Sequence, residues 1–286
     1  MSADWDRLAA KLEILVDRLE GILPPAAGAP DWKAATAFRW RKRNGHGFLA
    51  PVQHPHSIAF ADLKDIDDQK KRLRENTEQF VAGRPANNVL LTGARGTGKS
   101  SLVKAALNEF AKKGLRLIEV DKSDLVDLSD IVDLVVGRKE RFIVFCDDLS
   151  FEASDPGYKS LKVALDGSIA GSADNLLIYA TSNRRHLMPE YMQENLDAKH
   201  IDGEIHPGET TEEKISLSER FGLQLSFYPF DQEQYLDIAT HWVETYGGRM
   251  NDDVRRAALL WALERGSRSG RVASQFARDC AGRKKR

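Results

Sequence analysis

A glycine-rich octet at residues 93–100 constrains this chain more than any other feature. It reads GARGTGKS and matches the pattern G-x-x-x-x-G-K-[ST] in full. An apolar stretch, NVLLTG, leads into it, and a helix-like stretch, SSLVKAALNEFAKKG, follows it. In that setting the loop turns successive backbone N–H groups toward phosphate oxygens, and the start of the helix adds its positive end. The octet therefore predicts a phosphate-binding loop; the alternative is a glycine-rich turn that fits the pattern by chance.

Two side chains of this loop have predicted roles of their own. Lys99 should reach the β- and γ-phosphates of a nucleotide, and the Ser100 hydroxyl should bind Mg²⁺. The residues that we expect around the phosphates are Gly93, Ala94, Arg95, Gly96, Thr97, Gly98, Lys99, Ser100 and Ser101.

A pair of adjacent carboxylates supplies the rest of the predicted site. The stretch RFIVFCDD is typical of a buried strand that ends in two acids, Asp147 and Asp148. We predict that Asp147 shares the Mg²⁺ with Ser100 and that Asp148 polarises the attacking water. Glu152, four residues further on, is a rival for that second role. In the alternative interpretation, one aspartate caps a helix and the other is a solvated loop residue.

Apolar stretches alternate with amphipathic ones between residues 61 and 229. The predicted strands are NVLLTG, LRLIEVDKSDL, RFIVFCDD, NLLIYATSN and LQLSFYPF. Strands that are apolar on both faces and separated by helices are typical of an α/β fold with a parallel sheet covered on both sides. Three short helices are predicted after Pro229, near residues 232–246, 252–264 and 269–281. We therefore expect an α/β core over residues 61–229 and a small all-α domain over residues 230–286.

Two segments have no clear role in this scheme. Residues 1–60 are predicted to form a helical and irregular extension: apolar residues between Leu8 and Leu19 indicate one helix over residues 4–22, and residues 32–57 have no regular period. The run FRWRKR could contact a nucleic-acid backbone, but a solvated basic face is the favoured interpretation. Residues 186–216 form an unusually long charged link, either partly disordered or facing a partner.

Composition excludes several classes of protein. The 286 residues include 42 Lys and Arg against 43 Asp and Glu, so the net charge of -1 gives no overall attraction to nucleic acid or anionic membrane. No apolar run reaches 18 residues, and Cys146 and Cys280 belong to no metal-binding or disulfide pattern. We therefore expect a cytoplasmic protein with no membrane partner and no metal other than Mg²⁺.

The sequence resembles the AAA+ ATPases over about residues 60–282. No asparagine is followed by lysine, so the guanine-reading motif N-K-x-D is absent and adenine is favoured. The stretches CDDLSFE and SERFG resemble those of an uncharacterised bacterial AAA+ family in detail. The resemblance implies a P-loop NTPase fold with a parallel five-stranded sheet and a C-terminal helical lid. It also implies binding of ATP with Mg²⁺.

The resemblance implies further site residues. Asn183 matches the sensor-1 position, and Arg220 matches the arginine finger that acts on the nucleotide of a neighbouring subunit, which implies a homo-oligomer. Either Arg271 or Arg268 matches the sensor-2 position of the lid. AAA+ proteins usually have glutamate where this chain has Asp148, which is shorter by one methylene, so slow turnover or a contribution from Glu152 is implied.

We therefore predict an ATP-binding AAA+ protein that hydrolyses ATP in a Mg²⁺-dependent reaction and remodels or loads a macromolecular partner, either protein or nucleic acid. Two alternatives remain open. One is a P-loop kinase that phosphorylates a small substrate, and the other is a switch that binds ATP without hydrolysing it.

Overall fold

The computed structural model describes residues 30–151, 155–166, 174–183, 199–201, 204–206 and 217–283, and the single residues Trp5, Lys11 and Glu13. The chain divides into two compact units, residues 1–32 and residues 33–286. Most of the predicted helix over residues 4–22, with its leucines, falls outside the described residues. So does most of the segment 186–216, apart from a short antiparallel pair, β7 (Lys199–Ile201) and β8 (Glu204–His206).

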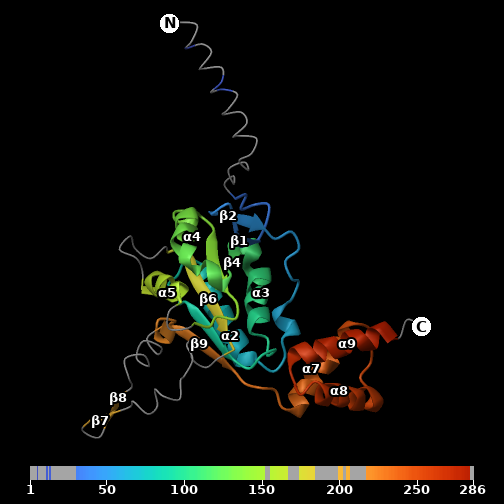
Figure 1. Ribbon diagram of the computed structural model, residues 1–286. Helices are drawn as coiled ribbons and strands as arrows, with labels where there is room; N and C mark the ends of the chain where they lie inside the picture. Colours follow the sequence, from blue (N-terminus) through green and yellow to red (C-terminus); the bar gives the residue numbers. More distant parts are fainter. Residues whose placement is uncertain are drawn as a thin grey trace. The chain divides into compact units, whose positions relative to one another are not determined.

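A seven-stranded sheet forms the centre of the second unit (Figure 1). Its order is β2-β1-β4-β5-β6-β3-β9, and neighbouring strands are parallel except for the β1–β2 pair. The strands are β1 (Ala37–Arg43), β2 (His46–Pro51), β3 (Val89–Gly93), β4 (Leu115–Glu119), β5 (Arg141–Cys146), β6 (Leu176–Ser182) and β9 (Leu223–Phe227). The mostly parallel sheet confirms the predicted α/β class, but the predicted count of five strands was wrong.

The two additional strands, β1 and β2, form a hairpin where the sequence analysis assigned no regular structure. Asn44 and Gly45 connect them with φ of 52° and 80°, and Arg43 pairs with His46 directly after the turn. Positive φ at both turn residues matches the twist of the two strands, and Asn-Gly strongly favours this conformation. Because β1 also pairs in parallel with β4, the hairpin extends the core sheet, and residues 37–51 are part of the α/β layer.

The basic and aromatic run of β1 is used inside the protein. Trp40 is buried, and its indole N–H donates to Asp127 at 2.9 Å. Lys42 pairs with the same carboxylate at 2.7 Å, and Arg39 pairs with Glu119 at 2.6 Å. These contacts join the hairpin to the segment before α4 and to β4, so the run is chiefly structural and gives no support to a nucleic-acid interface.

Helices cover both faces of the sheet, as the sequence predicted. Strand β5 has buried apolar residues on both faces. Ile143 and Phe145 belong to the main apolar cluster, whereas Phe142 and Val144 are buried outside that cluster. Figure 1 shows α2 and α3 on one side of the sheet, and α4 and α5 on the other. These helices are α2 (Asp67–Val81), α3 (Lys99–Phe110), α4 (Leu128–Val135) and α5 (Pro156–Asp166).

Three further helices form the C-terminal helical domain, or lid, at positions close to those predicted. They are α7 (Gln232–Thr245), α8 (Asp252–Glu264) and α9 (Gly270–Arg283). The buried Tyr235 hydroxyl of α7 donates to the carbonyl of Ala258 in α8 at 3.0 Å. Trp261 of α8 meets Phe276 of α9 edge to face, with ring centroids 6.0 Å apart. Apolar contacts and one buried hydrogen bond therefore hold the three helices together.

The strand order brings the ends of three central strands to one place. Strands β5, β6 and β3 are adjacent and parallel, so their carboxyl ends meet at the same edge of the sheet. The residues that follow them are Asp147, Asn183 and the glycine-rich loop. Ligands of open α/β sheets bind outside this edge, and the fold therefore places the predicted chemical groups together.

Candidate nucleotide-binding site

The phosphate loop runs from the end of β3 into the first turn of α3. It begins in close contact with β9, because a Cβ on Gly93 would lie 1.9 Å from the carbonyl oxygen of Phe227. The N–H of Ala94 donates to that same carbonyl at 3.1 Å. Gly93 and Ala94 thus anchor the loop to the sheet, and the residues from Arg95 to Ser101 line the pocket.

Lys99 is the first residue of α3, at the end of the loop, and it is buried. Its ammonium donates to the carbonyl oxygens of Gly93 and Ala94 at 2.8 and 2.7 Å, and to Oδ1 of Asn183 at 3.0 Å. Three acceptors therefore hold the ammonium beside the loop and next to the end of β6.

Burial lowers the pKa of the Lys99 ammonium to about 8, since removal from water disfavours the charged form. The carboxylates of Asp148 and Asp147 act in the opposite direction. The guanidinium groups of Arg271 and Arg95 add to the lowering. A concentration of positive charge at this point suits an anionic ligand, because negative charge would restore the stability of the ammonium.

Asp147 is held by two hydroxyl groups. The hydroxyl of Ser100 donates to its Oδ1 at 2.6 Å, and so does the hydroxyl of Thr181, also at 2.6 Å. The predicted metal residues Ser100 and Asp147 are therefore in direct contact. Sequence reasoning missed Thr181, because nothing local in the stretch ATSN indicates that its hydroxyl faces the neighbouring strand.

Asp148 points toward Asn183, the residue that the sequence analysis matched to the sensor-1 position. The side-chain amide of Asn183 donates to Oδ1 of Asp148 and accepts from Lys99. Asp148 has a φ of 53°, the left-handed region that few residues other than glycine adopt. Lys99, Asn183 and Asp148 thus form one continuous chain of hydrogen bonds.

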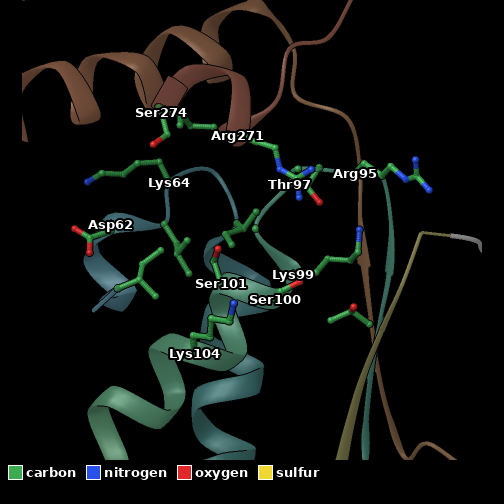
Figure 2. Close-up of a pocket in the computed structure, with 18 of the residues that line it drawn as sticks. Asp62, Lys64, Arg95, Thr97, Lys99, Ser100, Ser101, Lys104, Arg271 and Ser274 are labelled. Carbon is green, nitrogen blue, oxygen red and sulfur yellow. The ribbon is translucent and has the colours of Figure 1, made fainter. Parts of the chain in front are cut away.

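A pocket of about 660 Å³ opens beside these residues and is closed on one side by the lid. Figure 2 shows Lys99, Ser100 and Ser101 at the start of α3, with Arg271 extending from the lid toward Thr97. Arg271, which is the second residue of α9, lines the pocket. Arg268 is also described and is not among the lining residues, so of the two candidate arginines only Arg271 faces the site.

The lid lies directly on the phosphate loop. A Cβ on Gly96, which has a φ of 74°, would come within 2.9 Å of both Cβ and Oγ of Ser269. A Cβ on Gly270 would lie 3.2 Å from the carbonyl oxygen of Gly96. Two glycines therefore allow the start of α9 to approach the loop backbone. The N-terminus of α9 then lies, like that of α3, at the side of the pocket where phosphates are expected to bind.

An apolar wall forms the other end of the pocket. Part of it comes from the segment before α2, with Ile58, Leu63 and Ile66. The rest comes from α7 and the residues just before it, with Phe230, Ile238 and Trp242. Nε2 of His241 in α7 lies 3.4 Å from Oδ1 of Asp62, so core and lid also meet at this end. No local pattern predicts this wall, because its two parts lie more than 160 residues apart in the chain.

Two predicted residues remain. Arg220 pairs with Asp166 at the end of α5 and does not line the pocket. Glu152 falls outside the described residues, so its rival role stays a prediction.

In the described part of the chain, no helix combines the length and apolar character needed to cross a membrane. The same part holds no group of three or more His, Cys, Asp or Glu side chains arranged for a metal ion.

Comparisons with known proteins agree with this geometry. The chain is 31% identical over 145 residues to the ATP-dependent zinc metalloprotease FTSH 9 of Arabidopsis thaliana, a match that spans 45% of this chain and 18% of that protein. Among solved structures, RuvB of Thermotoga maritima has a TM-score of 0.55 at 15% identity and covers 79% of this chain, which in turn covers 65% of that chain. The FIGL-1 AAA domain in complex with ADP has a TM-score of 0.52 at 17% identity, with 79% and 73% covered.

These structures share the AAA+ fold with this chain, which spans only part of the length of the curated relative and of RuvB. One family model matches almost the whole second unit, over residues 33–284. The chain therefore belongs to the family described as "Protein of unknown function (DUF815)", within the AAA+ superfamily.

Proposed function

We propose that this protein binds ATP in the pocket between the core and the lid and hydrolyses it with the help of Mg²⁺. One observation carries the proposal: the phosphate-loop Lys99, the sensor residue Asn183 and the acidic Asp148 form a single hydrogen-bonded chain beside the Ser100–Asp147 pair. Cation, amide and carboxylates at the mouth of a glycine loop are the groups that phosphoryl transfer to water requires.

Each of the residues around the pocket has its own role in the proposed reaction. Lys99 exchanges its loop carbonyl acceptors for phosphate oxygens and neutralises their charge, and Arg271 adds a second cation from the lid. Asp148 accepts a hydrogen bond from the attacking water and orients it, while Asn183 fixes the direction of that carboxylate. The lid covers one side of the pocket and so limits the access of other water.

The metal fits the residues present. Ser100 and Asp147 already share a short hydrogen bond, and hydroxyl and carboxylate oxygens are the ligands that Mg²⁺ prefers. When bound there, the metal would neutralise charge on the β- and γ-phosphates. Both residues line the pocket beside Lys99, so they need no rearrangement of the fold to serve as ligands.

The base of the nucleotide has a place at the apolar wall. Ile58, Ile66 and Trp242 lie at the end of the pocket formed by the segment before α2 and by α7. Apolar and aromatic side chains of this kind suit a purine ring. Adenine is favoured because the chain has no guanine-reading motif, and because the name of the FTSH 9 relative describes it as ATP-dependent.

We further propose that Arg220 acts in trans, in a homo-oligomer. Its position outside the pocket of its own chain is what such a role requires, and its pairing with Asp166 fixes its orientation. Hydrolysis would then drive the remodelling or loading of a macromolecular partner. RuvB of Thermotoga maritima is described as a Holliday junction branch migration motor, which makes nucleic acid one partner class to test beside protein.

Phosphate release separates this function from its two competitors. Wild type, Asp147→Ala, Asp148→Asn and the surface control Lys113→Ala should be incubated with ATP and Mg²⁺ and no added acceptor. We expect free phosphate from wild type and from the control, and a loss of at least about 10²-fold in the two aspartate variants. ATP bound without phosphate release would favour a switch. Transfer of the γ-phosphoryl group to an added small acceptor, without release of free phosphate, would favour a kinase.

A further inference from the structure

Asp147 and Asp148 face the same pocket although they are adjacent in sequence. Consecutive residues of an extended strand point to opposite faces of the sheet. Both carboxylates nevertheless line the pocket, because β5 ends at Cys146 and the two aspartates lie in a turn, in which Asp148 has a φ of 53°. This conformation costs free energy in a residue with a side chain, so the surrounding structure has to hold it.

Thr181 of the neighbouring strand β6 contacts three consecutive residues at this point. Its hydroxyl donates to Oδ1 of Asp147 at 2.6 Å and accepts from the backbone N–H of Asp148 at 2.9 Å. Its carbonyl oxygen accepts from the N–H of Leu149 at 2.6 Å. The pairing of Cys146 with Ala180 at the end of β5 brings Thr181 opposite the pair.

The chemistry of a buried hydroxyl explains the choice of residue. Thr181 is only 2% exposed, so water has little access to it. A hydroxyl can donate one hydrogen bond and accept others at the same time, and Thr181 does both, toward a carboxylate and toward a backbone N–H. A valine of the same shape could do neither.

We propose that Thr181 is a positioning residue that assigns the two carboxylates to separate tasks. It holds Asp147 toward Ser100, and it stabilises the left-handed turn that carries Asp148 toward Asn183. The turn offsets the short side chain of Asp148, since it is the backbone that brings this carboxylate within hydrogen-bond distance of Asn183. The inference rests on the proposed ATPase function, because it gives Thr181 a role in that same site.

Two substitutions of Thr181 and one matched control test this role. Thr181→Val removes the hydroxyl and keeps the shape, while Thr181→Ser keeps the hydroxyl. Thr77→Val is the control: Thr77 is also fully buried, and its hydroxyl bonds Leu73 and Tyr179 away from the pocket. For each protein, the dissociation constant for ATP is measured in Mg²⁺ and in EDTA, with kcat, KM and the melting temperature.

Thr181→Val should bind ATP in EDTA like wild type, within about twofold, because the phosphate loop is intact. In Mg²⁺ its affinity for ATP should fall about tenfold or more, and its kcat should fall by a similar factor with a smaller change in KM. Thr181→Ser should restore both properties. Thr77→Val should lower the melting temperature without changing either one.

The proposal is overturned if Thr181→Val keeps the wild-type kcat and Mg²⁺ dependence, or if Thr181→Ser is as impaired as Thr181→Val. It is also overturned if Thr77→Val causes the same losses, because these would then follow from instability alone. A wild type that binds ATP and releases phosphate separates these outcomes from a failure of the proposed function. A wild type that does neither overturns both.

Discussion

The ammonium of Lys99 donates a hydrogen bond to Oδ1 of Asn183 at 3.0 Å, across 84 positions of the sequence. The amide of Asn183 in turn donates to Asp148. One side chain therefore couples the cation of the phosphate loop to the carboxylate that we propose orients water. Any ligand that draws Lys99 away from its present acceptors therefore changes the environment of both Asn183 and Asp148.

Asn183→Ala should lower kcat more than it lowers ATP affinity. Loss of the amide leaves Asp148 without its orienting donor, and we expect kcat to fall about 10²-fold while the dissociation constant for ATP changes less than about threefold. Asn175→Ala is the control, because Asn175 precedes the other end of β6 and bonds only backbone carbonyls in the described structure. A normal kcat in Asn183→Ala would contradict the role given to the amide.

ATP affinity should fall as the pH rises through about 8, the pKa to which burial lowers the Lys99 ammonium. Phosphates favour the charged form, so binding above that pH takes up a proton. Calorimetry at pH 8.5 in two buffers with different ionisation enthalpies should report this uptake, and Lys99→Met should abolish it.

The same shift has an effect on folding. The pKa of Lys99 in the folded protein is below its ordinary value of 10.5, so its burial costs stability below pH 8. This cost diminishes between pH 8 and 10.5, where the unfolded chain binds the extra proton. If wild type takes up no protons when it binds ATP at pH 8.5, this account of the Lys99 pKa is contradicted.

Gly96→Ala should weaken ATP binding by displacing the lid. The added Cβ would lie 2.9 Å from Ser269, so α9 and Arg271 must move away from the loop. Gly114→Ala is a matched control, since Gly114 also has positive φ, at 96°, but nothing lies within 4 Å of its Cβ position. Both variants should lose about 1–2 kcal/mol of stability from the backbone strain alone.

Only Gly96→Ala should lose ATP affinity, by about tenfold, because a shift of about 1 Å is costly in an aligned site. The dissociation constants and thermal unfolding of both variants are compared with wild type. Equal affinities in the two variants would show that the lid contact at Gly96 does not support binding.

Arg220→Ala should lower kcat about 10³-fold at protein concentrations where the wild-type rate per subunit has risen to a plateau. Asp166→Asn controls for the loss of the ion pair, because it removes the partner carboxylate and leaves Arg220 in place. The ATPase rate is measured against protein concentration for all three proteins. A wild-type rate per subunit that stays flat would argue against a contribution from a neighbouring subunit.

The features predicted correctly from sequence were those that a short contiguous stretch of residues determines. The apolar strands that end in the phosphate loop, in Asp147 and in Asn183 each have a local pattern, and the parallel order follows from the helices between them. The hairpin of β1 and β2 was missed although its signal, Asn44-Gly45, was present. Bases and aromatics are mixed around the turn, and buried and exposed positions do not alternate strictly in either strand, so no period of two marked the hairpin.

Other features depend on register and packing, and no local pattern encodes them. Thr181 bonds the two aspartates only because β5 and β6 pair as they do. The choice between Arg271 and Arg268 depends on where α9 begins and how it is rotated. Likewise, Trp242 and Ile58 meet at one pocket because the lid folds back on the core.

Calorimetric titration of ATP with Mg²⁺ into wild type, Lys99→Ala and the surface control Lys113→Ala tests the central claim most directly. We expect saturable binding of one ATP per chain by wild type and by the control, and a loss of affinity of about 10²-fold or more in Lys99→Ala, which removes the buried cation of the loop. No saturable binding by wild type, or equal binding by Lys99→Ala, would contradict the assignment of this pocket as an ATP site.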